Sequence, residues 1–123
     1  MRAKKILIAD DEPNIVVSLE FLMKQKGYVV KVVTNGEEVL QAVAEFGPDL
    51  ILLDVMMPGE DGFAVAERIR DDPGLAGVRV LFLTARADVG DHERSRSTGA
   101  VGHVTKPFNP SSLGDEVRAA LTR

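Results

Sequence analysis

The feature that most restricts the fold of this sequence is a series of short apolar runs, each followed by a longer amphipathic segment. The runs contain few polar residues and occupy positions 5–9, 28–33, 50–53, 78–83 and, more weakly, 101–104. Continuous apolar strands need cover on both faces, which is typical of a parallel sheet enclosed by two layers of helices. The pattern therefore predicts an α/β fold built from five βα units.

The amphipathic segments carry the start and stop signals of helices. Pro13 suits a first helical position, and Gly27 follows a basic stretch as a C-terminal stop. The run Thr34–Glu37 matches a capping box for the second helix. A third helix is expected over about Gly62–Arg70, and Asn109-Pro110 opens the last one. Short loops between these units favour an open, doubly wound sheet in one domain that covers residues 1–123.

The segment expected to form the fourth helix is poor in apolar side chains. Between Asp88 and Thr98 the only clearly apolar residue is Val89, and Gly and Ser are modest helix formers. A helix without an apolar stripe gains little from packing. We expect this segment to be short or mobile, and slow amide exchange throughout residues 88–98 would contradict that expectation.

Composition excludes several classes of function. The chain of 123 residues is 45% apolar, has a net charge of -4 and lacks cysteine. It can bury a core, but it has neither a thiol nucleophile nor the clustered positive charge that nucleic acid requires. No apolar run approaches the roughly 20 residues of a membrane span. We expect a cytoplasmic protein with no membrane partner and no direct contact with nucleic acid.

Polar residues gather at the carboxyl ends of the predicted strands. Asp10-Asp11 follow the first strand, and Asp54, Thr84 and Lys106 follow the third, fourth and fifth. Parallel strands bring these positions to one edge of the sheet, where doubly wound folds bind ligands. Converging carboxylates must bind protons or a cation, and oxygen-only ligands suit Mg²⁺. Because a carboxylate can also attack phosphorus, the set is chemically complete for phosphoryl transfer to an aspartate.

The same residues resemble the receiver domains of two-component response regulators. The matching motifs follow in order over almost the whole chain: Ile8–Glu12, Asp49–Gly62, Leu83–Ala85, Gly99–Ala100 and Lys106–Phe108. The resemblance implies a flavodoxin-like receiver fold with five parallel strands in the order 2-1-3-4-5. It also implies a signalling switch of a phosphorelay, which acts on itself and is not an enzyme for a diffusible substrate.

Carried over to this sequence, the resemblance implies a role for each acid. Asp54 is the phospho-acceptor, and its phosphoryl donor is a phosphohistidine of a sensor histidine kinase or phosphotransfer protein. Asp11 and Asp54 are direct ligands of Mg²⁺, together with the main-chain carbonyl of Met56. Asp10 acts on the metal through water. The downstream protein target is not named by the sequence.

The resemblance also implies a switch that reports the phosphoryl group. Thr84 and Lys106 hold the group, and the face of the fourth helix, fifth strand and fifth helix changes in response. The Lys106–Pro107 peptide bond is expected to be cis. His103 departs from the family, which usually has Tyr or Phe at this position. His is smaller than these residues and titrates near neutral pH. We therefore favour a partly exposed histidine at a strand end over a role in the switch.

Two other functions stay open at this point. A phosphohydrolase with an aspartyl-phosphate intermediate commonly has a second acid two residues after the nucleophile, and Met56 occupies that position here. An interaction module that keeps the fold without taking phosphate is disfavoured by the complete acidic site, although His103 and the polar fourth helix keep it open. The fold alone does not decide among the three.

Overall fold

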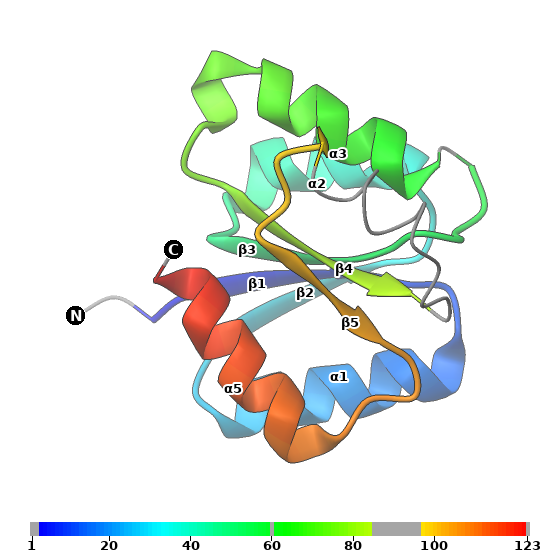
Figure 1. Cartoon of the computed structure of the whole chain (residues 1–123), viewed down its shortest axis with the longest axis vertical. Coiled ribbons are helices and arrows are strands. Elements are labelled where there is room, and N and C mark those ends of the chain that lie inside the picture. The colour runs from blue at the N-terminus through cyan, green and yellow to red at the C-terminus, as the bar shows by residue number, and fades with distance from the viewer. Residues whose placement is uncertain (1–2, 60, 85–96, 123) are drawn as a thin grey trace.

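The computed structural model describes residues 3–59, 61–84 and 97–122, which form one parallel sheet between two helical layers (Figure 1). The strands lie in the order β2-β1-β3-β4-β5, as predicted. Each predicted strand agrees with the structure to within one residue at either end. The bounds are β1 Lys5–Ala9, β2 Val29–Val33, β3 Leu50–Asp54, β4 Arg79–Thr84 and β5 Gly102–Thr105.

The sheet divides the core into two apolar clusters, one on each face. Side chains alternate across β1, so that Leu7 joins the cluster beneath α2 and α3, whereas Ile6 joins the cluster beneath α1 and α5. All five residues of β3 are buried. The edge strand β2 differs from the predicted continuous burial because half of it faces solvent, and Val29 is 45% exposed. An edge strand has a neighbour on one side only, so the helices cover it less completely.

The helices and one 3₁₀ turn cover both faces of the sheet, with α1 and α5 on one side and α2 and α3 on the other (Figure 1). Local signals set their starts, as predicted for the last helix: Asn109 Oδ1 accepts hydrogen bonds from the main-chain N–H groups of Ser111 and Ser112. The bounds are α1 Pro13–Gln25, α2 Glu37–Phe46, α3 Gly62–Asp71, η1 Pro73–Leu75 and α5 Pro110–Leu121.

The predicted capping box at Thr34–Glu37 is wrong by one residue. Asn35 Oδ1 accepts a hydrogen bond from the Glu38 N–H at 3.0 Å, and Asn35 Nδ2 donates to Glu38 Oε1 at 2.8 Å. The N-cap is Gly36, which has no side chain to accept a hydrogen bond, and its N–H donates to the carbonyl of Pro58 at 2.9 Å. This bond ties the start of α2 to the loop after β3.

The prediction of a short or mobile fourth helix falls almost wholly on residues 85–96, which lie outside the described part of the chain. The end of that segment is described: Thr98 is buried, and Gly99 has a φ of 83°. Arg70 Nη1, from the end of α3, donates to the carbonyl of Ser97 at 2.6 Å. Within the described ranges, none of the helices combines the length and the apolar character that a membrane crossing needs.

Candidate functional site

The candidate site lies at the carboxyl edge of the sheet, where four strands end in polar residues. Asp54 and Thr84 are the last residues of β3 and β4, while Asp10 and Lys106 directly follow β1 and β5. Asp10, Asp54 and Thr84 are all at least 97% buried. Parallel pairing of β1, β3, β4 and β5 thus collects titratable groups at one buried edge.

Lys106 connects the acidic residues of this edge. Its Nζ lies 2.8 Å from Asp10 Oδ2, 2.8 Å from Glu12 Oε1 and 3.4 Å from Asp54 Oδ2. Burial by itself lowers the pKa of Lys106, but the contacts with Asp10 and Glu12 and the charge of Asp54 outweigh it and raise the pKa above its ordinary value. The lysine is therefore an ammonium at every physiological pH, held slightly closer to Asp10 and Glu12 than to Asp54.

Main-chain atoms contact both the carboxylate and the carbonyl of Asp54 or lie close to them. Its Oδ1 accepts a hydrogen bond from the Met56 N–H at 2.9 Å. Its own carbonyl is covered closely by Gly62 at the start of α3, where a Cβ would lie only 2.7 Å from that oxygen. Burial raises the pKa of Asp54, partly offset by the Met56 hydrogen bond, and the charge of Asp10 raises it further. A carboxylate held this way is costly to ionise without additional positive charge.

Asp10 supplies an oxygen that the described residues leave without a hydrogen bond. Its Oδ1 accepts from the Glu12 N–H at 2.9 Å, whereas its buried Oδ2 accepts none, although the Lys106 ammonium lies beside it. Carboxylate oxygens of Asp10, Glu12 and Asp54 all lie within 4.8 Å of one another. A buried carboxylate oxygen that is paired with the Lys106 ammonium, in an all-oxygen donor set, can also face a hard dication such as Mg²⁺.

The sequence interpretation assigned no role to Glu12, which the structure brings into the site. Its carboxylate meets both Lys106 and the acidic cluster, although its side chain is 57% exposed. Asp11, implied as a direct metal ligand, is exposed and lies outside the acidic cluster of the described residues. The sequence feature that could have identified Glu12 is its place as the third acid of the run Asp10–Glu12. Which of these three acids faces the site depends on the local turn, in which Asp10 Oδ1 accepts a hydrogen bond from the Glu12 N–H.

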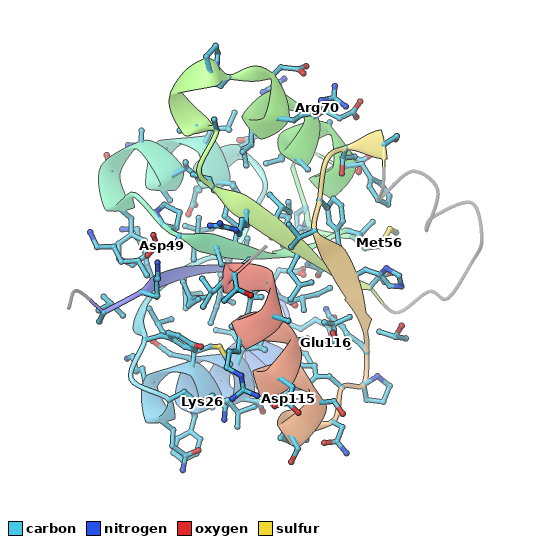
Figure 2. The ribbon with its side chains drawn as sticks, turned by 60° about the vertical axis from the view of Figure 1, so that its left-hand side comes forward. Lys26, Asp49, Met56, Arg70, Asp115 and Glu116 are labelled. Carbon is cyan, nitrogen blue, oxygen red and sulfur yellow. The ribbon has the colours of Figure 1, made fainter. Side chains whose placement is uncertain are left out.

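The remaining predicted residues lie around this cluster. The carbonyl of Thr84 accepts a hydrogen bond from the Lys106 N–H at 2.7 Å, and the Lys106–Pro107 peptide bond is cis. His103 lies in β5 opposite Phe82 and is partly exposed. It lines a hollow of about 340 Å³ together with Asp115 and Glu116. Figure 2 shows these two acids on α5. Its switch role stays a prediction.

Comparison with known proteins agrees with the fold and with the motifs at this edge. The model of the response regulator receiver domain matches residues 6–118. The DNA-binding response regulator MtrA of Mycolicibacterium smegmatis is 38% identical over 120 residues, which are 98% of this chain and 51% of that protein. The chain spans about half the length of the curated relatives it matches.

Solved structures give the same result. The chemotaxis response regulator CheY4 of Vibrio cholerae has a TM-score of 0.90 and 27% identity, covering 97% of this chain and 99% of that one. The BeF3-activated N-terminal receiver domain of Klebsiella pneumoniae RstA has a TM-score of 0.89 and 27% identity, covering 98% and 100%. These similarities extend over nearly the entire chain and include the strands that end in the site residues.

Proposed function

This chain belongs to the response regulator receiver domain family, and from that premise we propose that it is a switch that takes a phosphoryl group onto Asp54. The observation that carries the proposal is the position of the Lys106 ammonium, which contacts both the buried Asp54 and the buried Asp10. The arrangement pairs a nucleophilic carboxylate with a fixed positive charge at the point where a phosphoryl group would arrive.

In the proposed reaction, an Asp54 oxygen attacks the phosphorus of a phosphohistidine on a partner protein. The new O–P bond forms as the N–P bond breaks, and the imidazole leaves with the electron pair of that bond. The Met56 N–H holds Asp54 Oδ1 in place, so the carboxylate is oriented before the donor arrives. Lys106 can offset charge on the transferred group, and Thr84 at the end of β4 can donate a hydrogen bond to it.

The charge balance of the site supports a requirement for Mg²⁺. Three clustered carboxylates from Asp10, Glu12 and Asp54 face one ammonium, which leaves two negative charges when all are ionised. An anionic phosphoryl group would meet net repulsion there. Bound Mg²⁺ would supply the missing positive charge. Asp10, Asp54 and Glu12 can hold it, while direct ligation by Asp11 and by the carbonyl of Met56 remains a prediction from the family.

The proposed partners follow from membership of a two-component family. The phosphodonor is a sensor histidine kinase or a phosphotransfer protein in the cytoplasm, and the output is a change in the face that includes β5 and α5. The chain catalyses only its own phosphorylation and dephosphorylation. The relatives named as DNA-binding regulators are about twice as long, so we propose no nucleic-acid contact for the described domain itself.

The test is intact mass after incubation with acetyl phosphate and Mg²⁺. We expect a single adduct of about 80 Da, the mass of one phosphoryl group, that requires Mg²⁺ and is absent from Asp54→Asn. Asp61→Asn, which alters a helix cap outside the cluster, serves as the matched control and should still form the adduct. A folded protein that forms no adduct would favour a phosphate-independent interaction module, and steady release of phosphate from a simple phosphoester would favour a hydrolase.

A further inference from the structure

The outer edge of β2 presents main-chain hydrogen-bonding groups that no strand of the described residues meets. β2 lies at one end of the sheet, and its single neighbour there is β1. The Val29 N–H donates to the carbonyl of Lys4, on the side of β1. Because the bonding direction alternates along a strand, the N–H and carbonyl groups of Val30 and Val32 point away from β1. An extended chain can pair with these groups as an additional strand.

A groove of about 390 Å³ lies beside this edge, between β2 and α2. Its lining includes Lys31 and Val32 from β2 and Glu38, Gln41 and Glu45 from α2. The two acids are seven residues apart on the helix, which places them about 10.5 Å apart on one face. That distance is close to the span of three residues of an extended chain. The groove therefore offers both an open backbone edge and room for a short extended segment.

Three charged side chains of this groove, Lys31, Glu38 and Glu45, form no ion pair with the described residues. Asn35 Nδ2 donates to Glu38 Oε1 at 2.8 Å. Gln41 Nε2 donates to Glu45 Oε1 at 3.0 Å, so amide groups orient both acids. Because α2 follows β2 and runs back antiparallel to it, Glu38 lies toward the carboxyl end of β2, Glu45 toward its amino end, and Lys31 at the middle of the strand. The charges thus follow in the order negative, positive, negative.

We propose that this edge binds an extended segment of a partner protein that adds to β2 as a further strand and carries a basic, an acidic and a basic side chain at alternate positions. Alternate side chains of a strand share one face, so these three charges meet Glu38, Lys31 and Glu45 in turn. Two basic residues four apart on a strand are about 13 Å apart, and their long side chains reach both acids. The binding does not depend on a phosphoryl group at Asp54.

A second copy of this chain fits the same edge less well. Its β2 offers one lysine among valines, so antiparallel pairing of two copies at this place would bring their Lys31 side chains together. A lysine on an edge strand commonly prevents pairing of this kind. An acidic residue in the added strand turns the same lysine into an attractive contact, so Lys31 selects against a second copy and for the proposed segment.

Hydrogen exchange of the isotope-labelled domain with the peptide Lys-Val-Asp-Val-Lys tests the position of the site. Exchange should slow at Val30 and Val32, whose N–H groups gain partners, and stay unchanged at Val29, whose N–H is already bonded to Lys4. The charge-reversed peptide Asp-Val-Lys-Val-Asp should bind at least about tenfold more weakly, the factor for three reversed cross-strand pairs. No slowing at Val30 and Val32 with about 5 mM peptide, which fills most sites at a Kd of about 1 mM, would overturn the proposal.

Exchanging charges within the groove tests the recognition. Lys31→Glu should reverse the preference, so that this variant binds Lys-Val-Lys-Val-Lys more tightly than Lys-Val-Asp-Val-Lys. Glu45→Gln should weaken binding of Lys-Val-Asp-Val-Lys about two- to fivefold. Glu116→Gln, which removes an exposed acid of α5, is the matched control for net charge and should leave binding unchanged. An unchanged preference in Lys31→Glu would show attraction by net charge alone and refute the proposal.

Sedimentation of the domain without peptide tests the competing occupant. The proposal expects a monomer at this edge, with exchange at Val30 and Val32 independent of protein concentration. A dimer whose formation slows exchange at these two residues would identify a second copy as the occupant and overturn the assignment to a partner segment.

Discussion

Replacing Asp54 with Asn should make the metal-free domain more stable, because the change removes a buried charge and preserves the shape of the side chain. The Asn Oδ1 can still accept the hydrogen bond from the Met56 N–H. Lys106 keeps its two closer partners, Asp10 and Glu12. The substitution therefore isolates the free energy of placing one ionised carboxylate in this cluster.

The gain in the free energy of unfolding follows from three contributions: repulsion between carboxylates, attraction to Lys106, and desolvation of Asp54. At an effective dielectric constant of about 20, repulsion between Asp54 and a carboxylate up to 4.8 Å away is about 3.5 kcal/mol. Water around the exposed Glu12 reduces its share well below that value. Attraction to the Lys106 ammonium at 3.4 Å is about 5 kcal/mol. The Coulomb terms nearly cancel, so desolvation of the buried carboxylate decides the sign and gives Asn an advantage of about 1–3 kcal/mol.

The advantage should depend on pH in a defined direction. Burial raises the folded-state pKa of Asp54 above its ordinary value of 3.8. The protonated acid therefore stabilises the wild type at a pH below that ordinary value, and this contribution is lost as the pH rises through the folded pKa. The difference between the two proteins should accordingly be small in acid and largest at neutral pH.

Urea denaturation at a series of pH values, with a chelator present, measures the difference. Asp115→Asn, an exposed position on α5, is the matched control and should leave the free energy of unfolding unchanged. Saturating Mg²⁺ should then stabilise the wild type more than Asp54→Asn, because the variant lacks one ligand. A variant less stable than the wild type at pH 7 without metal would refute the reasoning, since the lysine contact would then outweigh desolvation.

Three further predictions concern other parts of the domain. Gly62→Ala should destabilise the fold and abolish phosphorylation because its Cβ would meet main-chain atoms. Gly114→Ala in α5 would displace only a flexible lysine side chain and should be tolerated, so thermal unfolding should show a lower midpoint for the first variant only. Glu12→Gln should weaken Mg²⁺ binding roughly tenfold in calorimetry, the scale for losing one charge about 5 Å from a dication in water, and unchanged affinity would remove it from the site. Arg70→Ala should accelerate amide exchange at residues 97–99 because it breaks the bond to the Ser97 carbonyl, and equal exchange rates would show that this bond does not hold the segment.

The sequence was sufficient to predict the buried strands and the residues that lie at the carboxyl ends of parallel strands. Apolar runs identified β1 and β3 because both strands are covered on both faces. The positions of Asp54 and Lys106 followed from parallel pairing, which brings equivalent strand ends to one edge. The family resemblance supplied the strand order that periodicity left among a few alternatives.

Features that depend on contacts between distant segments could not be predicted in the same way. The start of α2 includes a hydrogen bond from the Gly36 N–H to Pro58 in another loop, beside the pair that Asn35 makes with Glu38. Besides its local turn with Asp10, Glu12 is held at the site by Lys106, which follows it by 94 residues. The partial exposure of β2 follows from its place at the edge of the sheet, which a local pattern does not encode.

The geometry on which the proposed reaction rests also makes the site sensitive to what binds there. An apolar core on both faces of β1 and β3 holds Asp10 and Asp54 where water cannot solvate them, so their charges cannot relax by moving outward. Lys106 compensates only part of this charge, and it is shared among three carboxylates. Any cation or phosphoryl group at this edge must therefore redistribute the contacts of Lys106. Because the Lys106 N–H is bonded to the end of β4, that redistribution acts directly on the junction between β4 and β5, which is where a signal would leave the site.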